Sequence, residues 1–343
     1  MKIGIFWFIF ILFLEMIWRF DAILCLYLQH GGSMYYFIVN PHASEGRGRK
    51  IWDKVLRYLS KTHNAENFEA YITEKSGDAR EFAHQLSEKC QDPKTITVIG
   101  GEGTFNEVVD GINMDCNKIS IAYIPTKSDN DIARSFRRKY NLKSQLKRLF
   151  SDSEETLLDY GVLNCSTMNR RFAICSGIGL DAAIFDDIYA VKCTCENQPK
   201  KLNHIKKFRY LKTIIREFFK LKPTRGYVIL DGEKRHEFNN IMFISAHVHP
   251  YEGGYLICPN ASGVDGCLDI CIVSTRHKWR LLWIMLSSVF GTHVTRTGFH
   301  LYRCKEAEIH TSNPLPVHVD GEVVGKNCDF TLNCIPKKLK LKI

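Results

Sequence analysis

A glycine-rich turn between an expected strand and an expected helix constrains this chain more than any other feature. The β-branched run from Thr95 to Ile99 predicts a short buried strand. Three glycines follow within four positions, and they let the backbone turn sharply because no Cβ stands in the way. Apolar residues then recur at helical spacing, namely Phe105, Val108, Val109 and Ile112. The free N–H groups and the dipole at such a helix start favour a bound anion, and phosphate is the expected ligand. The alternative is a turn that needs glycine only for its shape.

The first half of the chain alternates expected strands with expected helices. Strands are predicted over Tyr35–Val39, in FEAYIT, over Thr95–Ile99 and over Ile119–Pro125, with helices from about Lys50 to Leu59 and from Glu81 to Lys89. This alternation predicts a three-layer α/β domain with a parallel sheet. Ligands of such sheets gather outside the carboxyl ends of the strands, where Asn40, Thr73, Gly100–Thr104 and the loop Pro125–Asn130 fall.

From about Leu157 the pattern changes to short strand-like runs separated by Gly, Pro, Asp and Asn. This pattern predicts a β-rich second domain, most simply a sandwich. Two helices are expected to interrupt it, over Lys200–Leu221 and His277–Phe290. The predicted domains are a leader at 1–33, an α/β domain at 34–156, a β-rich domain at 157–330, and a segment at 331–343 that could return to the first domain.

The net charge of +10 favours anionic partners such as nucleotides or an acidic membrane surface. Lys200–Leu221 is strongly basic and carries an apolar stripe at helical spacing. Such a helix is either a core helix with a solvated face or a docking surface for anionic lipid. No nucleic-acid recognition motif accompanies the charge, so nucleic acid is not expected as a partner.

The 13 cysteines show neither a repeated CxxC nor zinc-type spacing. Cys193 and Cys195 form the only close pair, and they are interpreted as ordinary thiols in a loop. An odd, scattered set suits a reducing compartment, so no structural disulfide is expected.

The leader is nearly all apolar over Ile3–Leu14 and again over Ile23–Leu28, but Glu15, Arg19 and Asp21 interrupt it. A clean membrane span needs about 20 uninterrupted apolar residues, so this is a marginal one. The sequence allows either a genuine N-terminal anchor or an over-extended start ahead of Met34, where the α/β domain begins at once.

From Met34 onward the chain resembles bacterial diacylglycerol-kinase-type lipid kinases, whose superfamily also holds sphingosine and ceramide kinases. Five stretches carry the resemblance in the right order: VNPHASEGRGRK, GGEGTFNEVVDGI, IPTKSDNDIARSF, PNASGVDGCLDICIV and HVDGEVV. The glycine motif alone is shared with NAD kinases and phosphofructokinases, whereas the later motifs are more specific. The resemblance implies two domains with ATP in the cleft between them, and transfer of the γ-phosphate of ATP to a lipid hydroxyl.

The resemblance also implies site residues. The nucleotide contacts carried over are Asn40, Pro41, His42, Ala43, Ser44, Thr73, Gly100, Gly101, Glu102, Gly103, Thr104, Phe105, Asn106 and Ser128. Magnesium is expected in PNASGVDGCLD, with the Asp265 carboxylate and the backbone carbonyls of Ser262 and Cys267 as ligands, although the same residues would also make an Asp-Gly hairpin turn. The general base is expected at Glu322, with Asp320 beside it and Glu102 as a further acidic residue of the catalytic site. Asp181 falls where the family has a substrate-side acidic residue.

Three residues depart from the family pattern. Glu102 stands where the family has an aspartate, and Lys127 and Asp129 stand where it has two glycines around the hydroxyl residue Ser128. Three functions stay open: an ATP- and Mg²⁺-dependent lipid kinase, a soluble NAD-kinase-like enzyme, which the glycine motif alone would permit, and a sensor that binds lipid or nucleotide without turnover, which the Lys127 and Asp129 changes favour. The first of these implies a cytoplasmic protein that associates peripherally with membranes, with a homodimer as a further possibility.

Overall fold

The structure is a computed structural model that describes residues 34–61, 68–88, 92–127, 130–135, 141–150, 155–166, 168–195, 212 and 214–342. The predicted leader, Ser128, Asp129 and most of the segment 200–221 lie outside the described residues. Within the described ranges, no helix is both long and apolar enough to cross a membrane.

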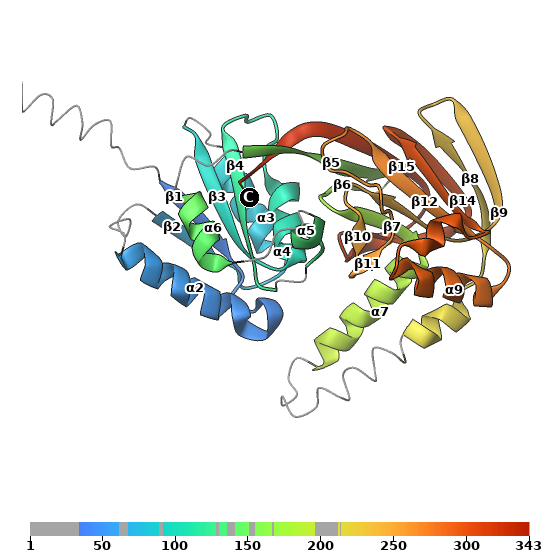
Figure 1. Ribbon diagram of the computed structural model, residues 1–343, viewed down its shortest axis with the longest axis horizontal. Coiled ribbons are helices and arrows are strands. Elements are labelled where there is room, and N and C mark those ends of the chain that lie inside the picture. Colours follow the sequence, from blue (N-terminus) through green and yellow to red (C-terminus); the bar gives the residue numbers. More distant parts are fainter. Residues whose placement is uncertain are drawn as a thin grey trace, which may run out of the picture.

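Four parallel strands form the sheet of the first part, in the order β4-β3-β1-β2 (Figure 1). They are β1 (Tyr35–Val39), β2 (Phe68–Ile72), β3 (Lys94–Gly100) and β4 (Ile119–Pro125). The helices of this part are α2 (Ala43–Lys61), α3 (Asp78–Glu88), α4 (Glu102–Gly111), α5 (Asp131–Ser135) and α6 (Leu142–Leu149).

Successive strand residues point to opposite faces of this sheet, and each face buries its own apolar cluster. Ile38, Ile96 and Val98 pack with α3 and α4. Phe37, Val39 and Ile99 pack with α2 and α6. Helices therefore cover both faces, which confirms the predicted three-layer α/β architecture.

The start of α2 contains a left-handed turn, because Ser44 and Glu45 have φ of 54° and 60° and Gly46 has φ of 83°. The regular helix follows this turn, close to the predicted start at Lys50. Gly48 lets the helix lie against the end of β1, since a Cβ there would come within 1.9 Å of the Asn40 carbonyl oxygen.

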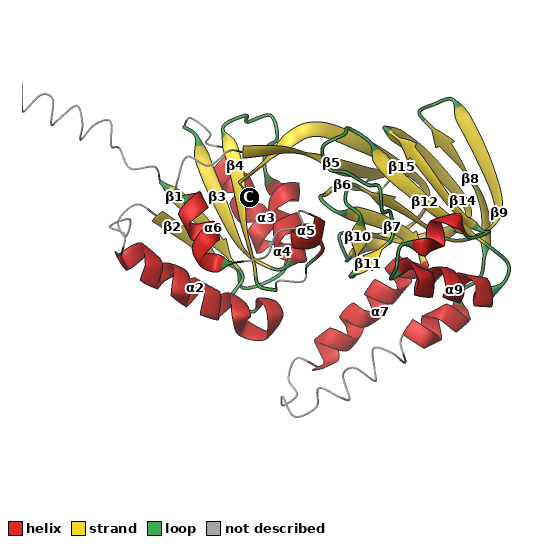
Figure 2. Ribbon diagram, in the orientation of Figure 1, coloured by secondary structure: helices red, strands yellow, loops and turns green. Residues whose placement is uncertain are grey.

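The second part is β-rich, as predicted, and its strands are largely antiparallel (Figure 2). They are β5 (Glu155–Cys165), β6 (Met168–Phe172), β7 (Cys175–Gly179), β8 (Thr224–Leu230), β9 (Lys234–His247), β12 (Leu268–Ser274), β13 (Phe299–Cys304), β14 (Glu306–Val319) and β15 (Glu322–Lys342), with the small hairpin β10 (Tyr251–Glu252) and β11 (Tyr255–Leu256). The remaining elements are α7 (Leu180–Cys195), α9 (Lys278–Ser288) and the 3₁₀ helix η2 (Thr292–Thr295).

The last strand joins the two parts. β15 pairs with β14 and β5 in the second part, and its end pairs in parallel with β4, where Leu341 lies opposite Ile121. Leu339 and Leu341 belong to the core cluster of the first part. Strand hydrogen bonding therefore runs continuously across both parts, and the boundary predicted between residues 156 and 157 falls inside β5.

Two expectations about cysteine are wrong. Cys193 and Cys195 lie in α7 rather than in a loop. Cys116 is disulfide-bonded, although no structural disulfide was expected. Spacing along the chain did not reveal that bond, because a disulfide depends on which sulfurs the fold brings together.

Candidate active site

The glycine turn leaves an open helix start. Gly101 is the N-cap of α4 and no side chain caps it. A Cβ on Gly101 or Gly103 would meet no atom within 4 Å, whereas a Cβ on Gly100 would lie 2.6 Å from the Thr104 side chain. Gly100 is thus needed for packing, while Gly101 and Gly103 leave the first turn of α4 accessible. This geometry fits the predicted anion site at the helix N-terminus.

Asn40 organises the two loops beside that turn. Its side-chain N–H donates to Thr104 Oγ1 over 3.0 Å. Its side-chain oxygen accepts from the backbone N–H groups of His42 at 3.1 Å and Ala43 at 3.0 Å. The next residue, Pro41, accepts from the backbone N–H of Arg49 through its carbonyl. One amide side chain therefore holds the end of β1 against the start of α4.

Hydrogen bonds between neighbouring strands hold the carboxyl ends of the four strands close together. The backbone N–H of Thr73 donates to Val39, and that of Thr126 donates to Gly100, each over 2.9 Å. The Ser44 and Thr126 hydroxyls lie 2.7 Å apart. Asn40, Ser44, Thr73 and the glycine turn, predicted from separate motifs, are therefore neighbours.

Two predicted contacts have side chains that serve the fold instead. The Phe105 ring is buried in the core, 4.7 Å from the Tyr123 ring. The Asn106 side chain is also buried and turns toward the second part of the chain. Of these two residues, only the backbone belongs to the turn. A third predicted nucleotide contact, Ser128, lies outside the described residues.

Glu102 forms a carboxylate pair with Asp131 beside the turn. Its Oε1 accepts from the Asp131 backbone N–H over 2.6 Å. Burial first, and then the nearby charge of Asp131, raise the pKa of Glu102 to about 7, while Lys127 acts in the opposite direction. Burial also raises the pKa of Asp131. A buried carboxylate whose charge is disfavoured by a second carboxylate, both with hard oxygen atoms, fits a magnesium ion chemically.

Asp131 also connects the first part to the β10–β11 hairpin. Its carboxylate accepts from the Gly254 backbone N–H over 3.0 Å, and Arg134 donates to the Gly254 carbonyl over 3.0 Å. Gly254 has φ of 86°, which a side chain would strain. The pair Glu102–Asp131 is thus fixed by contacts from both parts of the chain.

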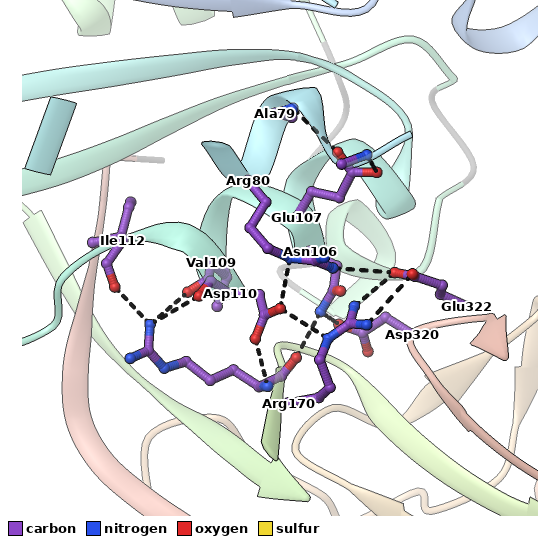
Figure 3. Close-up of polar contacts among 12 residues, drawn as sticks. Ala79, Arg80, Asn106, Glu107, Val109, Asp110, Ile112, Arg170, Asp320 and Glu322 are labelled. Atoms are coloured by element: carbon purple, nitrogen blue, oxygen red, sulfur yellow. Dashed lines mark hydrogen bonds and ion pairs between the residues drawn. The ribbon is translucent and has the colours of Figure 1, made fainter. Parts of the chain in front are cut away.

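Asp320 lies at a second contact between the two parts of the chain, which Figure 3 shows. One carboxylate oxygen accepts from the Asn106 side chain and the Ala173 N–H, each over 2.7 Å. The other accepts from the N–H groups of Ile174 at 3.0 Å and Cys175 at 2.8 Å. The Ala173, Ile174 and Cys175 N–H groups lie between the end of β6 and the start of β7, so these bonds fix the break between the two strands. Burial raises the pKa of Asp320, and the four donors oppose that shift.

Glu322 lies two residues further on and is held by arginines (Figure 3). Arg170 donates to it over 2.7 Å and 3.4 Å, and an Arg80 nitrogen lies 3.5 Å away. The Nε atoms of Arg80 and Arg170 both lie 2.8 Å from the Asp110 carboxylate. Glu322 is therefore the partly exposed end of a network that spans α3, α4, β6 and β15.

Arg171 fastens the other end of α4. Its guanidinium donates to the carbonyls of Val109, Asp110 and Ile112 at distances between 2.6 and 3.3 Å (Figure 3). These are the carbonyls that a helix C-terminus leaves without partners. The helix that carries the glycine turn is thus clamped at its far end by a residue of the second part.

Sequence reasoning missed Arg80, Asp110, Arg170, Arg171 and the role of Asp131. One signal was present, since Arg170 and Arg171 stand together just before the apolar run FAICSGIG. Two arginines beside a buried strand need carboxylate or carbonyl partners. The sequence did not say which ones, because those partners come from distant positions.

The predicted magnesium ligands form a turn in which the Asp265 carboxylate is already paired with a cationic side chain. One Asp265 oxygen accepts from the Cys267 N–H over 3.1 Å, and the other is paired with Arg303. Gly266, with φ of 74°, donates to Asp159 over 2.7 Å. These residues do not fit magnesium unless Arg303 moves away. The Ser262–Asp265–Cys267 site stays a prediction.

Asp181 begins α7 and is mostly buried beside His318. The His318 Nε2 atom lies 3.5 Å from Asp181 and 3.0 Å from Glu252. Asp181 therefore belongs to a buried polar cluster of the second part, and its predicted contact with substrate stays a prediction. A cavity of about 280 Å³ elsewhere in the second part is lined by β5, β8, β14 and β15 and by none of the predicted site residues.

Fold and site together point to the lipid-kinase class of proteins. Residues 34–162 match the family described as the diacylglycerol kinase catalytic domain. Residues 190–343 match the family described as the YegS C-terminal NAD kinase beta sandwich-like domain. The chain belongs to the diacylglycerol-kinase-type lipid kinase family that combines these two domains.

Several known proteins are similar to this chain. The Bacillus subtilis protein named "Putative lipid kinase YtlR" is 28% identical, over 90% of this chain and 99% of its own length. A protein of Staphylococcus saprophyticus named diacylglycerol kinase is 25% identical, over 84% of this chain and 88% of its own. A crystal structure from Bacillus anthracis, titled as that of a "putative diacylglycerol kinase", superposes with a TM-score of 0.68 at 21% identity, over 90% of this chain and 96% of that one. That last likeness concerns the fold.

Proposed function

We propose that this protein transfers the γ-phosphate of ATP to the hydroxyl of a membrane lipid, such as diacylglycerol or a sphingoid base. The observation that carries the proposal is the open first turn of α4, with Gly101 and Gly103 unobstructed, on a helix whose Asn106 bonds to Asp320, two residues before the arginine-held Glu322. Phosphoryl transfer depends mainly on positioning and on charge neutralisation, and this arrangement supplies groups for both.

Each group has a role in the proposal. The N–H groups at the start of α4 bind phosphate oxygens, and Asn40 and Ser44 hold the loops around them. Glu322 accepts the proton of the lipid hydroxyl, and Arg170 orients its carboxylate. Asp320 acts as a positioning residue, because four donors already occupy its oxygens.

Magnesium is part of the proposal at the glycine turn. Glu102 and Asp131 would hold the ion, since Glu102 accepts from the Asp131 backbone N–H and the charge of Asp131 raises the pKa of Glu102. A bound magnesium ion would neutralise charge on the phosphates. Glu102, in place of the family's aspartate, keeps the carboxylate for this purpose.

An anionic membrane surface is the proposed docking partner. The basic segment that first suggested it lies mostly outside the described residues, but α9 supports the idea independently. Trp279, Trp283 and Phe290 are exposed by 74%, 60% and 80%. Exposed Arg276 and Arg280 lie close by in the chain, and exposed Lys222 follows Phe219, whose carbonyl accepts from Lys278 of α9. An apolar face with tryptophan and flanking Lys and Arg is typical of helices that lie in the membrane interface.

The direct test is labelled ATP with a panel of lipid alcohols in mixed micelles, followed by product identification, for the parent and for Glu322→Gln. We expect one lipid class to be phosphorylated. Glu322→Gln should lower turnover by about 10²–10⁴-fold, because a positioned base contributes that much, while nucleotide affinity is retained.

Three outcomes would contradict the proposal. Phosphorylation of NAD instead of lipid would favour the NAD-kinase-like alternative. Tight ATP binding without transfer to any lipid alcohol would favour a sensor. Parental turnover in Glu322→Gln would remove Glu322 from the role of base.

A further inference from the structure

One face of the second part's sheet carries a buried polar stripe that the proposed reaction does not use. In the strand register, Ser245 of β9 lies opposite Cys271 of β12, and His247 lies opposite Cys175 of β7. The alternate residues Ile244 and Ala246 point to the other face, where they belong to the apolar core. The stripe is therefore set apart from that core by the pleat.

Three potential metal ligands converge on this stripe. A ring nitrogen of His247 and the sulfurs of Cys258 and Cys271 all lie within 4.8 Å of one another. All three residues have 0% of their surface exposed. Both cysteines are free thiols. Cys258 comes from the segment after β11 and packs down onto the sheet, so the three ligands belong to three separate stretches of chain.

The hydrogen bonds of the His247 ring indicate which of its two nitrogens could bind a metal. Its Nδ1 lies 3.1 Å from the His249 carbonyl oxygen, which can only accept, so Nδ1 carries a proton. In the neutral ring Nε2 then has a lone pair. Nε2 also lies 2.9 Å from the Ser245 hydroxyl, whose single proton has an alternative acceptor in Glu252 at 3.2 Å, and 3.4 Å from the Glu252 carboxylate itself. A metal ion bound at Nε2 would take the place of a proton shared with Glu252. A histidine that binds a metal through one ring nitrogen usually donates the N–H of the other ring nitrogen to a carbonyl or carboxylate.

We propose that His247, Cys258 and Cys271 bind a structural zinc ion, with Cys175 or Glu252 as the fourth ligand. Two thiolates and an imidazole are a ligand set that selects zinc over magnesium or calcium. Cys175 and Glu252 each offer a ligand atom within 4.8 Å of one on His247, but they form a group separate from the two thiols, so one of them would shift toward the ion to complete a tetrahedral set. Each thiol gives up its proton to solvent when it binds, and zinc changes no oxidation state.

A second buried triad, Asp181, Glu252 and His318, does not fit a metal equally well. The Nδ1 atom of His318 accepts from the Gly321 N–H over 3.2 Å, so the ring proton of a neutral His318 sits on Nε2. Nε2 is the atom that faces both carboxylates. A nitrogen that carries a proton offers no lone pair, so this triad is better explained by a protonated His318 that pairs with the two carboxylates.

The proposed ion would secure a contact between the two parts of the chain. Cys258 follows β11 directly, and the hairpin β10–β11 presents Gly254 to Asp131. Zinc would fasten the base of this hairpin to β9 and β12. Loss of the metal would loosen the support of Asp131 while leaving the glycine turn itself intact.

The test starts from the full chain. All three ligands are buried, so the metal should enter during folding, and the apo protein is made by unfolding with a chelator. We expect one zinc per chain after refolding with zinc and dialysis. Refolding with Co²⁺ should give a thiolate-to-cobalt charge-transfer band, which reports sulfur ligation without any substitution.

Variants then locate the ligands. Cys258→Ala and Cys271→Ala should each lose the zinc and the cobalt band. Cys304→Ala is the matched control, because Cys304 is also a buried free thiol but lies in the apolar core. Cys267→Ala, next to the predicted magnesium turn, should also keep both signals.

Three results would overturn the proposal. One is a folded parent that retains no zinc and shows no charge-transfer band. Another is full retention of zinc in a folded Cys258→Ala, Cys271→Ala double variant. The third is a Cys258–Cys271 disulfide found by mass spectrometry of the unreduced protein.

Discussion

The side-chain N–H of Asn106 donates a 2.7 Å hydrogen bond to the carboxylate of Asp320. Asn106 lies in the first half of α4, two residues after Thr104 of the glycine turn, and Asp320 lies in the turn between β14 and β15. The bond therefore connects the expected phosphate-binding helix to the strand that begins with Glu322. Both residues are buried or nearly so, and the same carboxylate also holds the start of β7.

We expect Asp320→Asn to destabilise the protein by about 2–5 kcal/mol, since an amide nitrogen would face backbone N–H donors that then lack an acceptor. Urea unfolding of the parent and the variant measures the difference. Asp329→Asn is the control, because Asp329 is exposed and pairs only with His310, and it should change stability by less than about 1 kcal/mol. Equal stability of Asp320→Asn and the parent would show that the four donors are satisfied elsewhere.

We expect Arg170→Lys to lower lipid-dependent turnover by roughly 10–100-fold while ATP affinity stays near the parental value. Lysine keeps the charge but cannot contact Asp110 and Glu322 at once through a planar fork. Steady-state kinetics and nucleotide titration measure the two effects. Arg235→Lys, at an exposed pair with Glu237, should behave as the parent. A normal turnover in Arg170→Lys would mean that Glu322 needs no such orientation.

Glu102 should make stability depend on pH. Its folded pKa of about 7 lies above its ordinary value of 4.5. Between these values the folded protein holds a proton that the unfolded chain has released, so the free energy of unfolding falls as pH rises through this window. Glu102→Gln lacks this effect, and it should gain up to about 3 kcal/mol relative to the parent between pH 4.5 and 8.

Urea unfolding of both proteins at the two pH values provides the check on Glu102. Added magnesium should reduce the difference at pH 8, if Glu102 holds the ion. Parallel pH profiles for parent and variant would rule out a raised pKa at this position.

Binding to anionic vesicles should weaken when the exposed tryptophans of α9 are removed. We expect Trp279→Ser with Trp283→Ser to reduce the bound fraction at least about tenfold, because two interfacial aromatic groups are lost. Added salt should weaken the binding of the parent, since surface charges are screened. Leu157→Ser, an exposed apolar residue of β5, is the control for general surface effects. If the bound fraction did not change with lipid charge, with added salt or with removal of both tryptophans, docking through α9 would be wrong.

The ion pair of Asp265 and Arg303 gives a test of the predicted magnesium turn. In the parent, magnesium should raise the unfolding temperature little through this turn, because Arg303 already supplies the positive charge. In Arg303→Gln, magnesium should stabilise the protein more, and Arg303→Gln with Asp265→Asn should lose that gain. Thermal unfolding with and without Mg²⁺ measures this. A large magnesium effect in the parent that Asp265→Asn abolishes would place the ion at Asp265 despite Arg303.

The sequence by itself determined the elements and the fold class. The alternation of strands and helices, the position of the glycine turn and the β-rich second half follow from local periodicity and from glycine's backbone freedom. These are properties of neighbouring residues, so they can be read from a single chain. The motifs also placed Asn40, Thr73 and Gly100–Thr104 at strand ends, which parallel pairing then brought together.

Only the tertiary structure decided which side chains face the site. Phe105 and Asn106 lie in a motif of nucleotide contacts, yet packing turned one ring into the core and the other side chain toward Asp320. The partners of Arg170, the pairing of Glu102 with Asp131, and the meeting of His247 with Cys258 and Cys271 join residues from distant stretches of chain. Such contacts depend on how whole elements pack. A local pattern shows that a charge or thiol needs a partner, but the folded chain determines which residue that partner is.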